Sequence, residues 1–414
     1  MKDRVSIVSV RGIGVEAAVR RAVELAGGLT ELITPHSRVL IKPNLCRPEQ
    51  SGRGVTTDCR VTEAVTRLVL ELKPKSVVIG EGAGAGYDFS GSTSTEEAFR
   101  VSGTADVAAR LGVELRNLNR DEWEEVSVKK PYIMDRVKIT RTVLESDVII
   151  SIPVIKTHQR TLVTLSLKNT KGVLPGAEKR KTHALGLDKA IADLNSVAKP
   201  SYVVVDGLVG MQGLWAYPQD KVEPGLILAG REPYAVDTVG TYLMGFNPSQ
   251  VMHLQYFAAR QRRKADLEHI DVVGEPLEAH RQSFRSGWEV FRERYPGVHI
   301  IEGKSVCSGC NGELIGALTA INSYGDHRAL DELTVVLGNA RRDEVPKTDK
   351  TVILGKCARH LSRLGLFSRG CPPMYDDIIR TICSTVGTDA DIVITSLEKE
   401  RNRRWDETEH LLAR

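Results

Sequence analysis

The amino-acid sequence predicts an α/β protein, with a mostly parallel sheet and βαβ crossovers in an N-terminal domain and a smaller C-terminal α/β domain that contains cysteines. Over the first 250 residues, short β-branched runs alternate with amphipathic helical patterns. Most of these runs are apolar at nearly every position, which is typical of strands buried on both faces. Beyond a charged stretch at residues 260–264, helices and strands alternate again, now with most of the cysteines.

The elements of the N-terminal domain follow one another along the chain. The helical patterns at 15–26 and 61–72 place small and branched apolar residues on one face. The second strand ends in Lys-Pro-Asn, and the third leads into a glycine-rich loop. The expected strands are residues 5–10, 38–43, 76–81, 148–154 and 202–206.

The C-terminal elements are shorter. Helices are expected near residues 287–295 and 313–320, a further helix at Cys371, and strands at 333–337 and 351–354. The predicted organisation is one domain over residues 1–260, a second over 265–396, and a charged tail over 397–414.

Composition limits the function classes. A net charge of +4 and an aromatic content of 5% argue against a nucleic-acid surface. The longest apolar run, residues 147–155, is far shorter than the roughly 20 residues of a membrane span. The N-terminus lacks the apolar core of a signal peptide, and the seven cysteines lack disulfide-framework spacing. We therefore expect a cytoplasmic protein without a membrane partner.

Four cysteines of the C-terminal region form a candidate metal site. Cys307 and Cys310 make a Cys-x-x-Cys pair, and Cys357 and Cys371 are single. Four thiolates suit zinc or an iron–sulfur cluster. Cys383 is left out, because it falls on an apolar helical stripe typical of a buried core thiol.

The spacing favours one [4Fe–4S] cluster, with zinc as the alternative. Zinc ribbons usually carry two Cys-x-x-Cys pairs about 15 to 20 residues apart, and only one pair exists here. Proline follows Cys371 directly, as in the bacterial ferredoxin run. A redox thiol pair or plain core cysteines remain further readings.

A second candidate site lies beyond the carboxyl ends of the N-terminal strands, where open α/β sheets bind ligands. The segment from Lys156 to Lys189 is rich in Lys and Arg and follows a buried strand, so it predicts a cradle for a phosphate or carboxylate. A solvated basic loop is the simpler alternative. The predicted ligand-binding residues are Asn44, Lys156, Lys168, Asn169, Lys171 and His183.

Acid–base candidates lie at the same edge. The predicted catalytic residues are His158, Glu81 and Asp206, because each follows or ends a strand. Asp193 and Asp237 are further candidates, although each could simply be a polar or capping position of a helix.

An ordered set of motifs resembles the DUF362 family over roughly residues 35 to 250. The motifs are Ile41-Lys-Pro-Asn-Leu45, Pro153-Val-Ile-Lys-Thr-His158, Ser166-Leu-Lys-Asn-Thr-Lys-Gly-Val-Leu-Pro175, His183, Ile191-Ala-Asp-Leu194, Val205-Asp-Gly207 and Ala235-Val-Asp237. The resemblance implies an iron–sulfur association and a binding role for the residues around Lys156 and Lys168. This chain lacks the compact ferredoxin runs common in such members, so at most one cluster is implied.

These observations predict an iron–sulfur oxidoreductase or reductive maturation enzyme that acts on an anionic small molecule. An electron donor of the ferredoxin type would be its partner. Two alternatives remain: a non-redox isomerase or lyase whose metal is structural or a Lewis acid, and a scaffold that binds a metallocofactor. The sequence does not predict the substrate or the oligomeric state.

Overall fold

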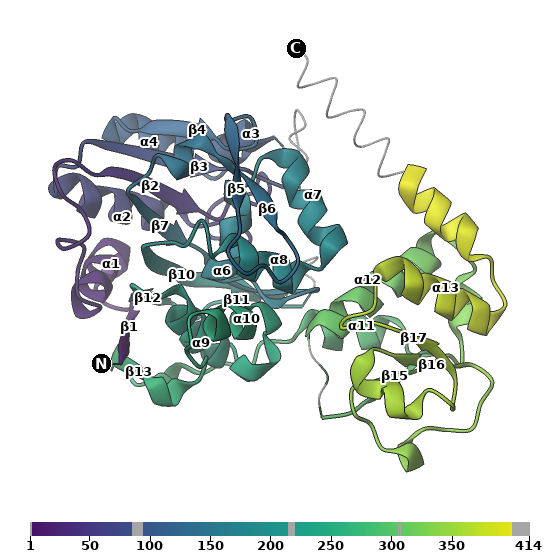
Figure 1. Ribbon diagram of the computed structural model, residues 1–414. Helices are drawn as coiled ribbons and strands as arrows, with labels where there is room; N and C mark the ends of the chain where they lie inside the picture. The colour runs from purple at the N-terminus through teal and green to yellow at the C-terminus, as the bar shows by residue number, and fades with distance from the viewer. Residues whose placement is uncertain (1, 85–93, 214–219, 305, 307, 400–414) are drawn as a thin grey trace.

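A computed structural model describes the protein at residues 2–84, 94–213, 220–304, 306 and 308–399. Two bodies are visible in Figure 1: a large one built on a twisted sheet with helices on both faces, and a smaller one that contains β15–β17 and α11–α13. The α/β class expected from the sequence is confirmed in both bodies.

The large sheet is mostly parallel, as predicted. Its strands run in the order β13-β1-β12-β10-β7-β2-β3-β4. From β10 to β4 every neighbouring pair is parallel, whereas β12 is antiparallel to both β1 and β10. The strands are β1 (Asp3–Ser9), β2 (Arg38–Pro43), β3 (Ser76–Glu81), β4 (Glu114–Asn117), β7 (Val148–Ile152), β10 (Tyr202–Met211), β12 (Leu226–Gly230) and β13 (Ile270–Gly274).

Apolar side chains on both faces of this sheet explain the helical layers. In β2, Val39 and Ile41 pack on one helical layer, and Leu40 packs on the opposite side of the sheet. One layer contains α1 (Gly14–Leu25), α2 (Cys59–Glu71) and α4 (Thr104–Leu111). The other contains α6 (Ser166–Asn169), α8 (Leu187–Leu194), α9 (Pro233–Leu243) and α10 (Met252–Arg260).

The strand expected at 148–154 is two strands. Pro153 has no N–H to donate to a ladder, and the chain shifts there from β7 to β8 (Val154–His158). β8 pairs with β10 beyond the end of β7 and forms a hairpin with β9 (Leu162–Val163). This extension carries Lys156 and His158 past the edge of the main sheet.

Shorter elements complete the large body. A separate hairpin, β5–β6, packs through Val126 and Val137 on the face of Leu40. These elements include β5 (Trp123–Ser127), β6 (Arg136–Thr140), β11 (Lys221–Val222), α3 (Thr95–Val101), α5 (Arg141–Leu144), the 3-10 turn η1 (Thr170–Val173) and α7 (Gly176–Leu185).

The C-terminal domain is built on a four-stranded sheet in which all pairs are parallel, in the order β14-β15-β16-β17. Val335 and Val352 face a core formed with α12 and α13, and Val336 and Ile353 face the 3-10 turn η8. The elements are β14 (His299–Glu302), β15 (Thr334–Leu337), β16 (Thr351–Leu354), β17 (Leu366–Ser368), α11 (Gly287–Arg294), α12 (Ser308–Tyr324), η8 (Lys356–Leu361) and α13 (Tyr375–Val386). Cys371 precedes α13 and is not helical, because α13 begins only after the Pro372-Pro373 pair.

The first body extends beyond the predicted boundary at residues 260–265. Strand β13 pairs in parallel with β1, and Phe284 packs in the core of the large body. The chain therefore leaves the first body shortly before α11. Of the expected tail at 397–414, residues 400–414 lie outside the described residues. Among the residues described, no helix has both the length and the apolar character that crossing a bilayer requires.

Candidate functional site

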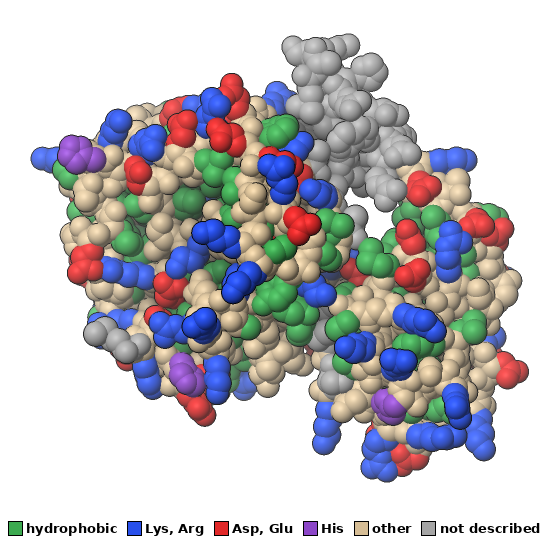
Figure 2. Space-filling model, in the orientation of Figure 1, with side chains coloured by type: hydrophobic (Ala, Val, Ile, Leu, Met, Phe, Trp, Pro, Cys, Tyr) green, Lys and Arg blue, Asp and Glu red, His purple; other side chains and the backbone are tan. Residues whose placement is uncertain are grey.

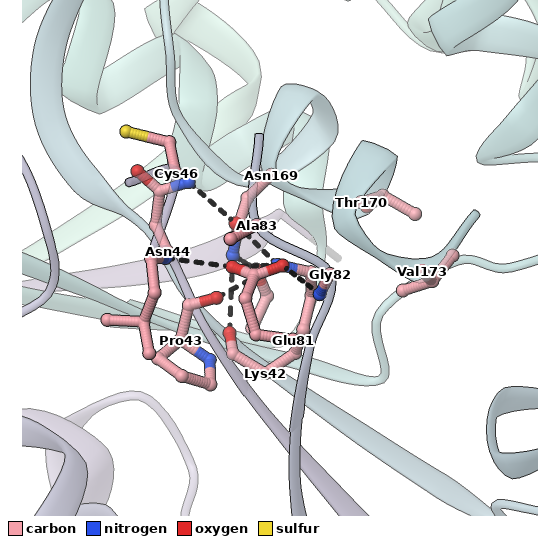
Figure 3. A network of polar contacts seen from close by, with 12 residues as sticks. Lys42, Pro43, Asn44, Cys46, Glu81, Gly82, Ala83, Asn169, Thr170 and Val173 are labelled. Carbon is pink, nitrogen blue, oxygen red and sulfur yellow. Dashed lines mark hydrogen bonds and ion pairs between the residues drawn. The ribbon is translucent and has the colours of Figure 1, made fainter. Parts of the chain in front are cut away.

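A buried ion pair lies at the carboxyl ends of β2 and β3 (Figure 3). The Lys42 Nζ is 2.9 Å from both carboxylate oxygens of Glu81, and each side chain is at most 2% exposed. Glu81 also accepts hydrogen bonds of 2.8 Å from the backbone amides of Leu45 and Gly82. A Cβ on Gly172 would lie 2.0 Å from the carboxylate, so only glycine fits there. Burial lowers the pKa of Lys42, and the Glu81 carboxylate opposes that shift.

Two asparagines connect this pair to α6. The Asn169 Oδ1 accepts from Lys42 Nζ at 2.8 Å and from Asn44 Nδ2 at 3.1 Å. The Asn169 Nδ2 donates to the Lys42 carbonyl at 3.2 Å and to Ser151 Oγ at 3.0 Å. The buried Asn44 Oδ1 has no hydrogen-bond partner among the described residues. The network fixes the junction of α6 and η1 against the ends of two strands and leaves the Asn44 Oδ1 without a donor.

Three further lysines gather beside this network, and with Lys42 they form what we call the lysine cluster (Lys42, Lys156, Lys168, Lys171). The Lys156 Nζ donates to the Val55 carbonyl at 2.5 Å and lies 3.3 Å from Cys46 Sγ. Lys171 is buried and donates to the Lys179 carbonyl at 3.3 Å. Burial, followed by repulsion from Lys168 and Lys179, lowers the pKa of Lys171 well below its usual value.

Lys168 is the member of the lysine cluster whose charge is not paired with any described residue. Its side chain is half-buried, and its amine has no hydrogen-bond or ion-pair partner within the described part of the chain. Desolvation and then the Lys156 charge lower the pKa of Lys168 to about 8. An unpaired amine among other cations is a place where an anion would be stabilised.

Asp237 holds the short helix that carries Lys168. From α9, its carboxylate accepts the backbone N–H groups of Ser166 at 2.8 Å and Leu167 at 2.9 Å. Burial raises the pKa of Asp237 to about 7. Asp193 similarly accepts the amides of Tyr132, Ile133 and Met134. Asp237 therefore caps α6, and Asp193 holds the loop before β6, so each has a structural role that the sequence left open.

The three predicted catalytic residues have different surroundings. Glu81 is buried, pairs with Lys42 and accepts two backbone amides. Asp206 is buried and accepts backbone amides of Asp58 at 2.7 Å and Leu208 at 3.0 Å, and burial raises its pKa to about 7. His158, at the end of β8, is half-buried and its Nδ1 accepts from the Arg160 amide at 3.1 Å. The side chain of His183 lies outside the described residues.

The predicted metal ligands follow strands of the C-terminal sheet. The Cys307–Cys310 pair comes after β14, Cys357 after β16 and Cys371 after β17. Since these strands are parallel, the three loops meet at one edge of the sheet, which we call the cysteine edge. A Cβ on Gly355 would lie 3.0 Å from Cys310 Sγ and 3.8 Å from the Gly370 carbonyl oxygen.

The predicted cysteine ligands do not form a complete metal site among the described residues. Cys310 is buried, Cys357 and Cys371 are exposed, and Cys307 lies outside the described residues. Within the described ranges, no three His, Cys, Asp or Glu side chains converge as metal ligands. The four-cysteine site therefore stays a prediction. Cys383 is fully buried in the core, where the sequence expects it.

The two bodies meet close to both sites. Arg160, in the β8–β9 hairpin, forms an ion pair with Glu313 of α12. A Cβ on Gly312 would lie 2.4 Å from Arg160 Cα, so α12 packs tightly on the hairpin. Cys310 is one helical turn before Glu313, and His158 is two residues before Arg160.

Several residues of the site were not singled out from the sequence. Lys42 is the lysine of the Lys-Pro-Asn motif, and Cys46 lies two residues after that motif. Lys179 donates to the Gly82 carbonyl at 2.5 Å and to Asn119 Oδ1 at 2.6 Å. The position of Lys42 at a strand end, beside the predicted Asn44, is the sequence feature that could have identified it.

Comparisons with known proteins give the family. Residues 39–242 match the model described as "Domain of unknown function (DUF362)". Over 241 residues, the chain is 24% identical to the thylakoid-associated protein sll1697 of Synechocystis sp., an alignment that covers 57% of this chain and 71% of that protein. The solved lactate racemase apoprotein from Thermoanaerobacterium thermosaccharolyticum superposes with a TM-score of 0.40 and 12% identity, covering 95% of this chain and 82% of that one. This match places residues 39–242, about half of the chain, in the DUF362 family.

Proposed function

We propose that the protein is an iron–sulfur oxidoreductase, or a reductive maturation enzyme, that binds an anionic small molecule at the lysine cluster. The observation that carries the proposal is Lys168, a half-buried lysine at the carboxyl edge of a parallel sheet whose amine has no partner among the described residues. Ligands of open α/β sheets bind at this edge.

An anion would complete the local charge balance. Neither Lys168 nor Lys171 forms an ion pair with any described carboxylate. A phosphate or carboxylate oxygen would accept from Lys168, and each charged hydrogen bond of this kind contributes about 1.5 to 3 kcal/mol. The orphaned Asn44 Oδ1 offers an acceptor for a hydroxyl or protonated group of the same ligand.

The hydrogen bonds of the acid–base candidates support different roles for them. The carboxylates of Glu81 and Asp206 already accept backbone amides, which favours positioning roles for both. Lys168 has a pKa of about 8, so its ammonium is able to donate a proton near neutral pH. We therefore assign proton delivery to Lys168 and a supporting role to His158.

The cysteine edge fits a four-thiolate group in part. Three loops meet there, Gly355 leaves room for the Cys310 sulfur, and the donors are all thiols. Cys307, Cys310, Cys357 and Cys371 would hold one [4Fe–4S] cluster, with zinc as the alternative ion. When bound, the cluster would supply single electrons. The Arg160–Glu313 contact, one turn from Cys310 and two residues from His158, supports a short separation between the two sites.

A non-redox isomerase or lyase is the second candidate. The amine of Lys168, partly neutral above pH 7, could remove a proton from a bound anion without any electron transfer. A metal at the cysteine edge would then be structural.

Anion titrations test the binding role. Phosphate and a panel of small carboxylates would be titrated calorimetrically into wild-type protein, Lys168→Ala and Lys199→Ala. Lys199 is a surface lysine paired with Glu232, just before the amino end of β10. We expect Lys168→Ala to weaken binding about tenfold or more, because it removes a charged hydrogen bond. Lys199→Ala should bind normally. Normal binding by a Lys168→Ala protein that melts early would assign Lys168 to the fold and refute the site.

A further inference from the structure

The sequence that surrounds two of the candidate ligands has an unusual charge composition. Residues 351–375 contain Lys and Arg at four positions and neither Asp nor Glu, although acidic residues are nearly as common as basic ones in the whole chain. All four cations are exposed. They are Lys356, Arg359, Arg363 and Arg369.

Ion pairs neutralise some of the other cations of this domain. Arg292 pairs with Glu302, Arg380 with Asp391, and Lys350 lies 3.7 Å from Glu332. By contrast, none of the four cations in 351–375 has an ion pair with a described carboxylate. Their charges are therefore available to a partner.

Three of the four cations lie beside the exposed thiols. Arg363 instead lies near the amino ends of β16 and β17, because Gly365, two residues later, approaches the Thr351 carbonyl oxygen. The Lys356 amide donates to the Gly370 carbonyl at 2.7 Å, which places Lys356 beside the Arg369–Cys371 turn. Arg359 is in η8 together with Cys357, and Arg363 follows that turn. Basic side chains gather over β15–β17 in Figure 2, whereas the acidic ones of this domain are mostly near α13. We call Lys356, Arg359 and Arg369 the basic rim.

We infer that the basic rim is the docking surface for a small acidic electron-carrier protein; this inference rests on the proposed function. Two exposed cysteines inside the rim, Cys357 and Cys371, let a partner approach the candidate electron-transfer group closely. Met374, 49% exposed beside Cys371, offers apolar contact at the centre of the surface.

The arrangement also favours one direction of electron flow. On the side of Cys310, α12 packs against the β8–β9 hairpin of the lysine cluster. On the side of Cys357 and Cys371, the sheet edge is exposed. Electrons would enter through the basic rim and leave toward the lysine cluster.

A protein partner fits this surface better than nucleic acid or a membrane. The rim has no exposed aromatic side chain on which bases would stack, and its cations surround thiols rather than an amphipathic apolar face. Opposite charges steer weak, fast encounters that salt screens, which suits an electron carrier that must bind and leave repeatedly.

The test is a titration of anaerobically prepared, full-length protein with an acidic ferredoxin as the probe, at about 20 mM and about 300 mM salt. Lys356→Glu is compared with Lys350→Glu. The two lysines lie just after and just before β16, so the same charge reversal is made at opposite edges of one sheet. The double variant Arg359→Glu/Arg369→Glu extends the comparison.

We expect wild-type protein to bind the ferredoxin at low salt and to lose most of the affinity at high salt. Lys356→Glu should weaken binding roughly tenfold, the double variant more, and Lys350→Glu less than twofold. Visible absorbance and iron analysis of each sample separate this result from the proposed function. Protein that contains zinc yet binds through the rim would refute the redox role and with it the electron-carrier assignment, whereas iron-loaded protein that does not bind would refute the docking surface alone.

Equal weakening by Lys350→Glu, or no salt-dependent binding by cluster-loaded protein, would overturn the inference. Tighter binding of anionic vesicles or single-stranded DNA through the same three residues would overturn it as well. The three side chains are exposed, so circular dichroism of each rim variant should match that of the wild type.

Discussion

The lysine cluster and the cysteine edge occupy equivalent places, beyond the carboxyl ends of parallel strands in two different sheets. Their side chains are held in different ways. At the lysine cluster, Lys42, Glu81 and Asn169 are buried and hydrogen-bonded to one another and to the backbone. At the cysteine edge, Cys357 and Cys371 are exposed, and no set of ligands converges among the described residues.

The difference follows from the cost of burial. A buried charge without partners is strongly unfavourable, so the polar groups under the lysine cluster must be satisfied by the protein itself. Exposed thiols carry no such requirement, and a metal site of this type gains its geometry when the metal binds. The first site should therefore persist without its ligand, whereas the second should depend on its metal.

Loss of one cysteine ligand should have the largest effect. Protein purified without oxygen should be brown and contain close to stoichiometric iron and sulfide for one cluster. Cys371→Ser should lose most of that iron, because a structural metal requires its full ligand set. Cys383→Ser, in the buried core, should keep it. Anion binding at the lysine cluster should be the same in both variants.

Metal analysis decides the identity of the bound group. One zinc and no iron, in protein made under iron-replete and oxygen-free conditions, would exclude the redox function. Full iron retention by Cys371→Ser would remove this residue from the ligand set.

Removal of Glu81 should have the next largest effect. Glu81→Ala leaves the buried Lys42 ammonium without its counter-ion, and breaking one side of a buried pair costs about 3 to 5 kcal/mol in the free energy of unfolding. Asp271→Ala removes the exposed partner of Arg4, and surface pairs contribute at most about 1 kcal/mol. Urea unfolding of the two variants measures the contrast. Similar midpoints would mean that Lys42 is neutral in the folded protein or that water solvates it.

The sequence was a good guide where the local pattern determines the element. The apolar runs predicted β2 and β3 at residues 38–43 and 76–81, which are the bounds observed. The pattern did not reveal that β12 inserts antiparallel between β1 and β10, because strand order depends on contacts between distant segments. Nor did it place β13 in the first sheet.

The same limit applies to the site. Strand ends placed Asn44, Glu81 and Lys156 at one edge, since parallel strands bring their carboxyl ends together. The pairing of Lys42 with Glu81, and the capping of α6 by Asp237, join residues far apart in the chain. No local pattern encodes which lysine is paired and which one, Lys168, is left with an unused charge.

The pH dependence of anion binding should give the smallest effect and the sharpest test of Lys168. Its pKa of about 8 means that the unliganded protein loses this positive charge as the pH rises through 8. Because a bound anion favours the ammonium form, affinity should be constant below pH 7 and fall about tenfold by pH 9. Sulfate, which keeps its charge over this range, is the probe. Lys168→Arg stays charged, so its affinity should change little between pH 7 and 9. The iron bound at the cysteine edge should not change over this range. An equal decline of anion affinity in both proteins would assign the titration to another group, such as Lys171.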